Sequence, residues 1–169
     1  MKPFLCSAIV FLGTFFWIAS SVGVADAQHL FFIERSTNKN IVQYDAHTME
    51  DGNLARAVPV LVYWILENGE KENLSKIQRK YAYGIESHKR LQDNRYEIVM
   101  SALKERKITV KETDDGYKAF VLINGREGIL ERLYVKCVEI LPGLPNILYV
   151  DLFGRDAQAN LAVTERLSP

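Results

Sequence analysis

The chain has 169 residues with 21 basic and 21 acidic side chains, so its formal net charge at pH 7 is zero. A balanced charge argues against a protein that gains affinity by neutralising phosphates, so nucleic acid is not an expected partner. Hydrophobic residues make up 48% of the chain, enough for one domain with a substantial core.

The first 27 residues have the composition of a secretory signal peptide. Lys2 precedes an apolar run over residues 4–18, and Ala25 and Ala27 have the spacing that a signal peptidase reads. We expect cleavage after Ala27 and export to the periplasm or the cell exterior. The alternative is an uncleaved anchor, because about 20 apolar residues can span a bilayer. After cleavage, residues 28–169 would form a single β-rich domain with no membrane span.

The exported part begins with a predicted β-hairpin. Residues 29–34 have strand composition, residues 36–40 have turn chemistry, and residues 41–45 alternate apolar and polar side chains. Residues 58–66 then form a nearly continuous apolar run. Such a run is typical of a strand that is covered on both faces.

One helix is predicted directly after this run. Ser75 and Gln78 have the spacing of a capping box, and Ile77 and Tyr81 lie one turn apart on the same face. Gly84 is placed to end the helix in a left-handed conformation. We expect this helix to cover the sheet or to plug it.

Strand signals then recur at short intervals, over residues 96–103, 108–112, 117–123, 129–140, 146–153 and 161–167. Asp114-Asp115-Gly116 and Asn124-Gly125 are typical hairpin turns, and strands joined by short turns pair antiparallel. Residues 86–95 could extend the helix instead. The predicted fold is mainly β: a single antiparallel β-barrel or β-sandwich of about nine strands, with one short helix packed on it or plugging it.

Several motifs resemble one known family. They are FIERS at residues 32–36, Asn38, Asn40, IV at 41–42, YD at 44–45, PV at 59–60, YWI at 63–65, YAYG at 81–84, the strand at 117–123 and VDLFGRD at 150–156. With these motifs the chain resembles the family catalogued as domain of unknown function 4833. The resemblance implies one exported bacterial domain. It implies no established activity, substrate or catalytic residue.

The sequence contains few groups that could hold a metal or attack a substrate. His29, His47 and His88 are isolated, so we expect no metal site and no cofactor. Cleavage would leave Cys137 as the single cysteine, which excludes an intramolecular disulfide. Cys137 should face the same way as Leu133 on a strand, which favours a buried small hydrophobe. A thiol nucleophile is the alternative, and it would need exposure.

The candidate binding residues are aromatic and polar. Aromatic rings with polar tips, together with one arginine, could line a pocket for a small amphipathic or carbonyl-bearing ligand. The candidates are Arg35, Asn38, Tyr44, Tyr63, Trp64, Tyr81 and Tyr83. The alternative is an ordinary aromatic core, with Arg35 paired to Glu34 or Glu67.

Three functions fit the sequence. The first is a non-catalytic exported binding module for a small, partly apolar ligand. The second is a structural or interaction protein of the envelope that binds another protein through a sheet edge or the Ile77/Tyr81 face. The third is a hydrolase that uses Asp45 and His47, which are two positions apart and could share one face of a strand.

Overall fold

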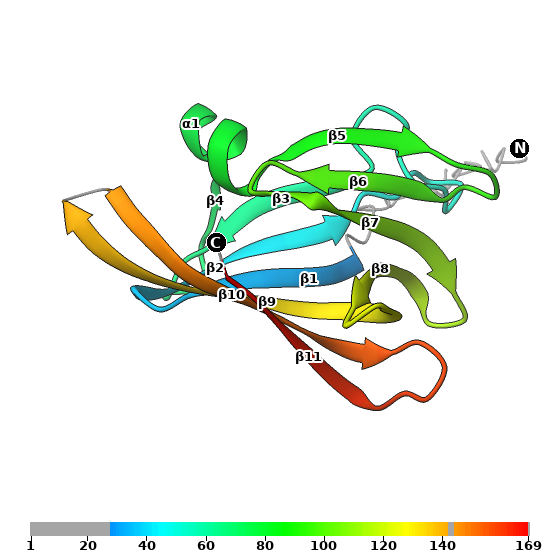
Figure 1. The fold of residues 1–169 in the computed structure, drawn as a ribbon. Helices are drawn as coiled ribbons and strands as arrows, with labels where there is room; N and C mark the ends of the chain where they lie inside the picture. The colour runs from blue at the N-terminus through cyan, green and yellow to red at the C-terminus, as the bar shows by residue number, and fades with distance from the viewer. Residues whose placement is uncertain (1–27, 142–143, 169) are drawn as a thin grey trace, which may run out of the picture.

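The computed structural model describes residues 28–141 and 144–168, which form one curled, open sheet with a short helical segment at one end (Figure 1). The signal peptide is predicted for residues 1–27, so that prediction lies outside the described residues. The mainly β character is confirmed. The sheet has 11 strands, more than the nine or so expected.

The strands are β1 (Gln28–Arg35), β2 (Asn38–Ala46), β3 (Val60–Ile65), β4 (Lys71–Asn73), β5 (Ile85–Arg90), β6 (Tyr96–Met100), β7 (Leu103–Thr113), β8 (Gly116–Ile123), β9 (Arg126–Leu141), β10 (Leu144–Asp156) and β11 (Ala162–Leu167). The helical segment consists of α1 (Lys76–Gln78) followed by one wider π-helical turn, η1 (Arg79–Tyr83).

The predicted hairpins are confirmed. β1 and β2 pair antiparallel, and Arg35 faces Asn38 across the two-residue turn Ser36-Thr37. β8 and β9 are joined by Asn124 and Gly125, whose φ angles of 50° and 76° are both positive. Two residues with positive φ give the turn whose twist matches that of the flanking strands, and Asn and Gly adopt this conformation most easily.

The long strand β9 joins two halves of the sheet. Ile129 lies between β8 and β10, whereas Leu133 lies between β1 and β10. β8 and β1 therefore pair with successive stretches of one edge of β9, and β10 follows the opposite edge. We call β1–β4 the first wing and β5–β8 the second wing.

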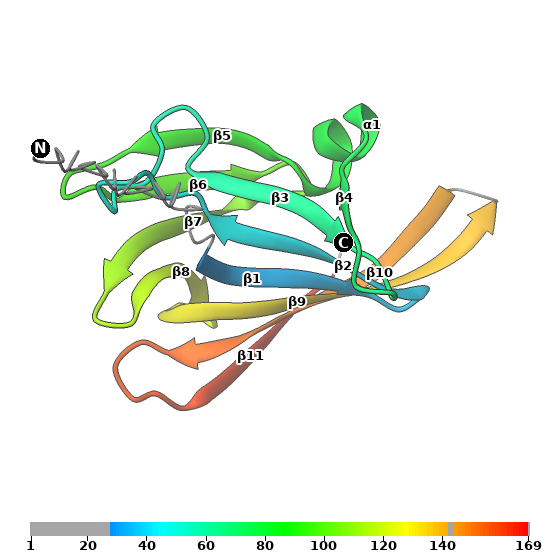
Figure 2. The same cartoon turned by 180° about the vertical axis from the view of Figure 1, so that it is seen from behind.

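The predicted closed barrel or sandwich is wrong, and so is the wholly antiparallel pairing. β1 runs parallel to β9, which is possible because about a hundred residues separate them and no short turn imposes an antiparallel direction. The sheet ends at β4 and at β5 instead of closing, and β11, which pairs only with β10, forms a third edge. β10 pairs with the edge of β9 opposite to β1, and β11 extends the sheet on this side (Figure 2).

A single buried cluster fills the space between the wings. Phe31 stacks on Tyr44 in the first wing, with their ring centroids 4.4 Å apart. Ile98 and Ile108 of the second wing belong to the same cluster and are fully buried. The fold is therefore held by one hydrophobic core, without a disulfide in the described part of the chain.

Two local expectations are wrong. β3 is buried on one face only, since Val60, Val62 and Trp64 are buried while the residues between them are half-buried. In the described part of the chain no helix covers its outer face, because α1 and η1 lie at the end of the sheet (Figure 1). Residues 86–95 do not extend the helix, because β5 begins at Ile85.

The start of the helix is as expected, but its end is not. Ser75 and Gln78 form both bonds of the capping box. Gly84 is extended, with φ −70° and ψ 165°. A Cβ at this position would lie 2.0 Å from the carbonyl oxygen of Arg79. Glycine is therefore required here for a close backbone approach, and not for a left-handed cap.

Candidate functional site

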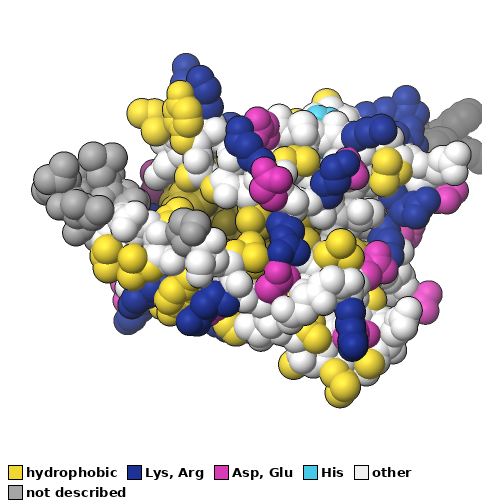
Figure 3. Space-filling model, viewed as in Figure 1, with side chains coloured by type: hydrophobic (Ala, Val, Ile, Leu, Met, Phe, Trp, Pro, Cys, Tyr) yellow, Lys and Arg dark blue, Asp and Glu magenta, His cyan; other side chains and the backbone are white. Residues whose placement is uncertain are grey.

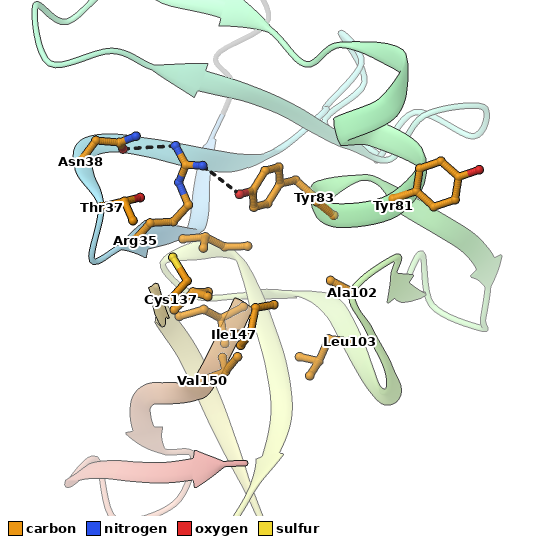
Figure 4. A pocket seen from close by; sticks show the side chains of 14 residues that line it. Arg35, Thr37, Asn38, Tyr81, Tyr83, Ala102, Leu103, Cys137, Ile147 and Val150 are labelled. Carbon is orange, nitrogen blue, oxygen red and sulfur yellow. Dashed lines mark hydrogen bonds between the residues drawn. The ribbon is translucent and has the colours of Figure 1, made fainter. Parts of the chain in front are cut away.

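A cavity of about 350 Å³ lies between η1, the turn at Ser101-Ala102, the end of β1 and the β9–β10 pair (Figure 4). The residues that line it are Ile33, Arg35, Thr37, Asn38, Tyr81, Ala82, Tyr83, Ala102, Leu103, Leu133, Val135, Cys137, Ile147 and Val150. In the space-filling view, hydrophobic side chains surround a hollow below α1 (Figure 3). The site is thus a largely apolar recess.

The apolar wall comes mainly from β9 and β10. Leu133, Val135 and Cys137 occupy alternate positions on β9, so all three face the cavity. Ile147 and Val150 extend this wall from β10. The alternation on β9 is visible in the sequence, but the sequence does not reveal that β9 pairs with β1. For that reason the prediction missed every wall residue from these two strands.

Arg35 is the one charged side chain among the described residues that line the cavity. Its guanidinium lies over the Trp64 ring, with Cζ 4.6 Å from the ring centroid. It donates hydrogen bonds to the hydroxyl of Tyr83 (3.3 Å) and to Oδ1 of Asn38 (3.2 Å). The structure thus brings together four of the predicted residues, of which Trp64 lies behind the guanidinium.

The expected pairing of Arg35 with Glu34 or Glu67 is wrong. Glu34 accepts a hydrogen bond from Arg132 of β9 at 2.9 Å, and Glu67 forms an ion pair with Lys39 at 2.9 Å. Neighbouring side chains on a strand point to opposite faces, so Glu34 and Arg35 do not face the same surroundings.

Tyr44 and Trp64 support the cavity from behind. The Tyr44 hydroxyl donates to the backbone carbonyl of Tyr83 at 2.6 Å, which ties η1 to β2. Burial raises the pKa of Tyr44 well above its usual value, and the nearby Tyr83 adds to this shift. The Trp64 ring meets Tyr83 edge to face at 5.2 Å. Both residues therefore fix the position of Tyr83.

Tyr81 and Tyr63 differ from the rest of the predicted set. Tyr81 reaches the cavity, but it is 66% exposed and its ring points away from Arg35 (Figure 4). Tyr63 does not line the cavity. It neighbours Trp64 on β3 and so faces the outer side of the sheet, where its hydroxyl bonds to Asp45.

The expected Asp45 and His47 pair does not form. Asp45 accepts a hydrogen bond from Gln43 at 2.8 Å and lies 3.4 Å from Nδ1 of His29. Nδ1 of His47 lies 2.9 Å from the carbonyl oxygen of Val58 instead. β2 ends at Ala46, so the strand alternation that would align the two residues does not reach His47.

Cys137 is buried, as expected, with 6% of its surface exposed. Its backbone N–H donates to Oγ of Ser36 at 3.1 Å, and that hydroxyl donates to the Cys137 carbonyl at 2.9 Å. These bonds continue the pairing of β1 with β9 beyond Arg35. Cys137 thus contributes its side chain to the apolar wall and its backbone to the sheet.

Among the side chains that the structure describes, no three from His, Cys, Asp or Glu are grouped so that they could hold a metal ion. None of the helical segments in the described part of the chain is long and apolar enough to cross a membrane.

The family model for a domain of unknown function, DUF4833, matches residues 31–166. The chain belongs to the DUF4833 family. Every residue that lines the cavity lies inside the matched range, so the DUF4833 domain contains the whole candidate site. Comparisons with curated proteins and with solved structures gave no match.

Proposed function

We propose that this DUF4833 protein is a non-catalytic binding module, exported by its N-terminal signal, that holds a small, partly apolar ligand. The cavity below η1 is the observation that supports this function. Its volume of about 350 Å³ falls within the usual range for small-molecule sites, roughly 300–1,000 Å³. Such sites combine apolar walls with a few polar groups, as this one does.

The chemistry of the lining supports binding without catalysis. Neither a carboxylate nor an imidazole is present among the described lining residues, so these residues offer no carboxylate–imidazole pair for acid–base catalysis. Cys137 is the one thiol there, and its burial argues against a reactive thiolate. The remaining polar groups are suited to hydrogen bonding.

A neutral fluorescent probe tests the cavity. Protein expressed from the full coding sequence is titrated with N-phenylnaphthylamine, whose fluorescence rises in apolar surroundings. We expect saturable binding. Ala102→Trp should weaken it at least about tenfold, because Ala102 lines the cavity and is exposed enough to accept a large ring without repacking the core.

Leu122→Trp is the matched control. Leu122 is 53% exposed on β8 and does not line the cavity, so this variant should bind the probe like the unmodified protein. Absence of saturable binding, or equal loss in both variants, would contradict a ligand site in this cavity.

Exposed side chains around α1 support a second candidate, an interface for another envelope protein. Ile77 and Tyr81 are 73% and 66% exposed, and Ile147 and Leu148 of β10 are 41% and 42% exposed. Exposed apolar groups of this kind are typical of protein contacts. The sheet edges are less suitable, because β4 has three residues, β5 is rich in charged side chains and β11 carries Glu165 and Arg166.

Ile77→Ala separates the two candidates, because Ile77 does not line the cavity. Pull-down from an envelope extract should recover a partner with the unmodified protein and lose it with Ile77→Ala and Tyr81→Ala combined. Ile77→Ala alone should bind the fluorescent probe normally. Equal recovery of a partner by both forms would argue against an interface on this face.

A further inference from the structure

We propose that the ligand carries a carboxylate, which Arg35 binds at one end of the cavity while the apolar part of the ligand lies along β9 and β10. This inference rests on the proposed function and adds the chemical class of the ligand: a small amphiphile with one negative charge.

The charge of Arg35 has no counterion among the side chains that the structure describes. No carboxylate among them forms an ion pair with Arg35, and the nearby Glu34 pairs with Arg132. The groups that contact the guanidinium are neutral: the hydroxyl and ring of Tyr83, the amide of Asn38 and the ring of Trp64. A partly buried charge is costly unless it is paired, so an anion from outside would complete this site.

The guanidinium also has unused hydrogen-bond donors. Arginine carries five N–H groups, and Arg35 uses one on each terminal nitrogen, for Tyr83 and Asn38. Its Nε is buried without an acceptor. A carboxylate can accept two parallel bonds from a guanidinium, which a neutral hydroxyl cannot do. The bonds to Tyr83 and Asn38 hold the group in place before the ligand arrives.

The cavity has a polar end and an apolar end. Thr37 and Asn38 lie beside Arg35, whereas Leu103 and Val150 lie on the opposite side (Figure 4). A ligand with a charged head and an apolar body matches this arrangement. One cation balances a carboxylate, whereas a phosphate monoester carries about −1.5 to −2 charges at pH 7 and would remain under-compensated.

Four probes, each with a ten-carbon chain, test the head group. Decanoate, decanol, decyl phosphate and decyltrimethylammonium each compete with N-phenylnaphthylamine at pH 7, below their micelle-forming concentrations. In the unmodified protein, decanoate should bind at least about tenfold more tightly than decanol, and decyltrimethylammonium should bind most weakly.

Arg35→Met then identifies the group responsible. Methionine keeps an unbranched side chain against Trp64 and removes the charge, so the preference for decanoate over decanol should disappear. Arg132→Met is the matched control. It removes an arginine that pairs with Glu34 and does not line the cavity, and it should keep the preference.

The outcomes distinguish this inference from the proposed function. Equal binding of decanoate and decanol to the unmodified protein would overturn the carboxylate assignment and leave the pocket in place. Tighter binding of decyl phosphate than of decanoate would also overturn it. If neither the fluorescent probe nor any of the four ten-carbon compounds binds, the proposal that this cavity is a ligand site is contradicted. The comparison of head groups uses unmodified protein, so it does not depend on whether Arg35→Met folds.

Discussion

Asp45 is a buried carboxylate on the outer side of the first wing. Its side chain is 2% exposed, and it accepts hydrogen bonds from Gln43 and from the hydroxyl of Tyr63. Burial by itself would raise the pKa of Asp45. The hydrogen bonds from His29, Tyr63 and Gln43 together outweigh this effect, so the pKa lies below its usual value. The pKa of Tyr63 is raised, first by burial and second by the hydrogen bond and charge of Asp45.

We expect Asp45→Asn to destabilise the protein at pH 7 by about 1–3 kcal/mol, because the amide nitrogen cannot accept the bonds that the carboxylate accepts. A carboxyl group with a lowered pKa stabilises the fold above its unfolded pKa, about 3.9, and this stabilisation is lost as the pH falls through the folded value. Urea unfolding between pH 7 and pH 3 should therefore show the two proteins converging at low pH.

Asp114→Asn is the control for this measurement. Asp114 lies in an exposed turn, so its substitution should change stability by no more than about 0.5 kcal/mol at pH 7. A constant difference between Asp45→Asn and the unmodified protein across the whole pH range would contradict the role assigned to the carboxylate.

Sequence reasoning could have placed Tyr63 correctly. Tyr63 and Trp64 are adjacent on a strand, and adjacent residues face opposite sides, so one pocket cannot hold both. The contact between Arg35 and Tyr83, in contrast, could not be predicted from the sequence. Their side chains meet although 48 positions separate them, and no local pattern indicates which strand end lies beside the helix.

At the scale of elements, the short segment of α1 and η1 connects local sequence to the cavity. The Ser75 hydroxyl accepts the N–H of Gln78 at 3.2 Å, and Oε1 of Gln78 accepts the N–H of Ser75 at 2.9 Å. The same Oε1 lies 3.3 Å from Nε1 of Trp64, which donates to it. The capping box therefore positions η1, and with it Tyr83, against the first wing.

We expect Ser75→Ala to destabilise the protein by about 1 kcal/mol, the usual cost of losing an N-cap. Because η1 forms one wall of the cavity, the same change should weaken binding of N-phenylnaphthylamine several-fold. Thermal unfolding and probe titration measure the two effects. Ser87→Ala, at an exposed position on β5, should change neither, and an unchanged probe affinity in Ser75→Ala would show that the cap does not position the wall.

At the scale of the whole molecule, the two wings share one core and one central strand. The buried cluster includes Leu30 from the first wing and Ile108 from the second. β9 pairs with β8 and then with β1, so both wings are hydrogen-bonded to the same strand. We infer that the wings unfold together.

Leu30→Ala and Ile108→Ala test this cooperativity. Each should lower the free energy of unfolding by about 2–5 kcal/mol, since each leaves a cavity in the core. Hydrogen exchange should show this loss in the slowest amides of both wings, whichever wing carries the substitution. Leu161→Ala, at a 67% exposed position, should have little effect. Loss of protection confined to the substituted wing would mean that the wings unfold separately.

By itself, the sequence determined the features that depend on neighbouring residues. These are the mainly β character, the hairpins at Ser36-Thr37 and Asn124-Gly125, and the capping box at Ser75, because turns and caps form between residues a few positions apart. The alternation around Cys137 also predicted its burial.

Only the tertiary structure decided how these elements meet. The parallel pairing of β1 with β9 brings Arg35 beside the apolar wall of β9 and β10, and the sheet stays open because β4 and β5 do not pair. Strand alternation specifies which side chains share a face, but it does not specify which strand lies alongside. Pairing between distant strands depends on how the whole core packs, so the cavity follows from the complete fold and not from any single segment.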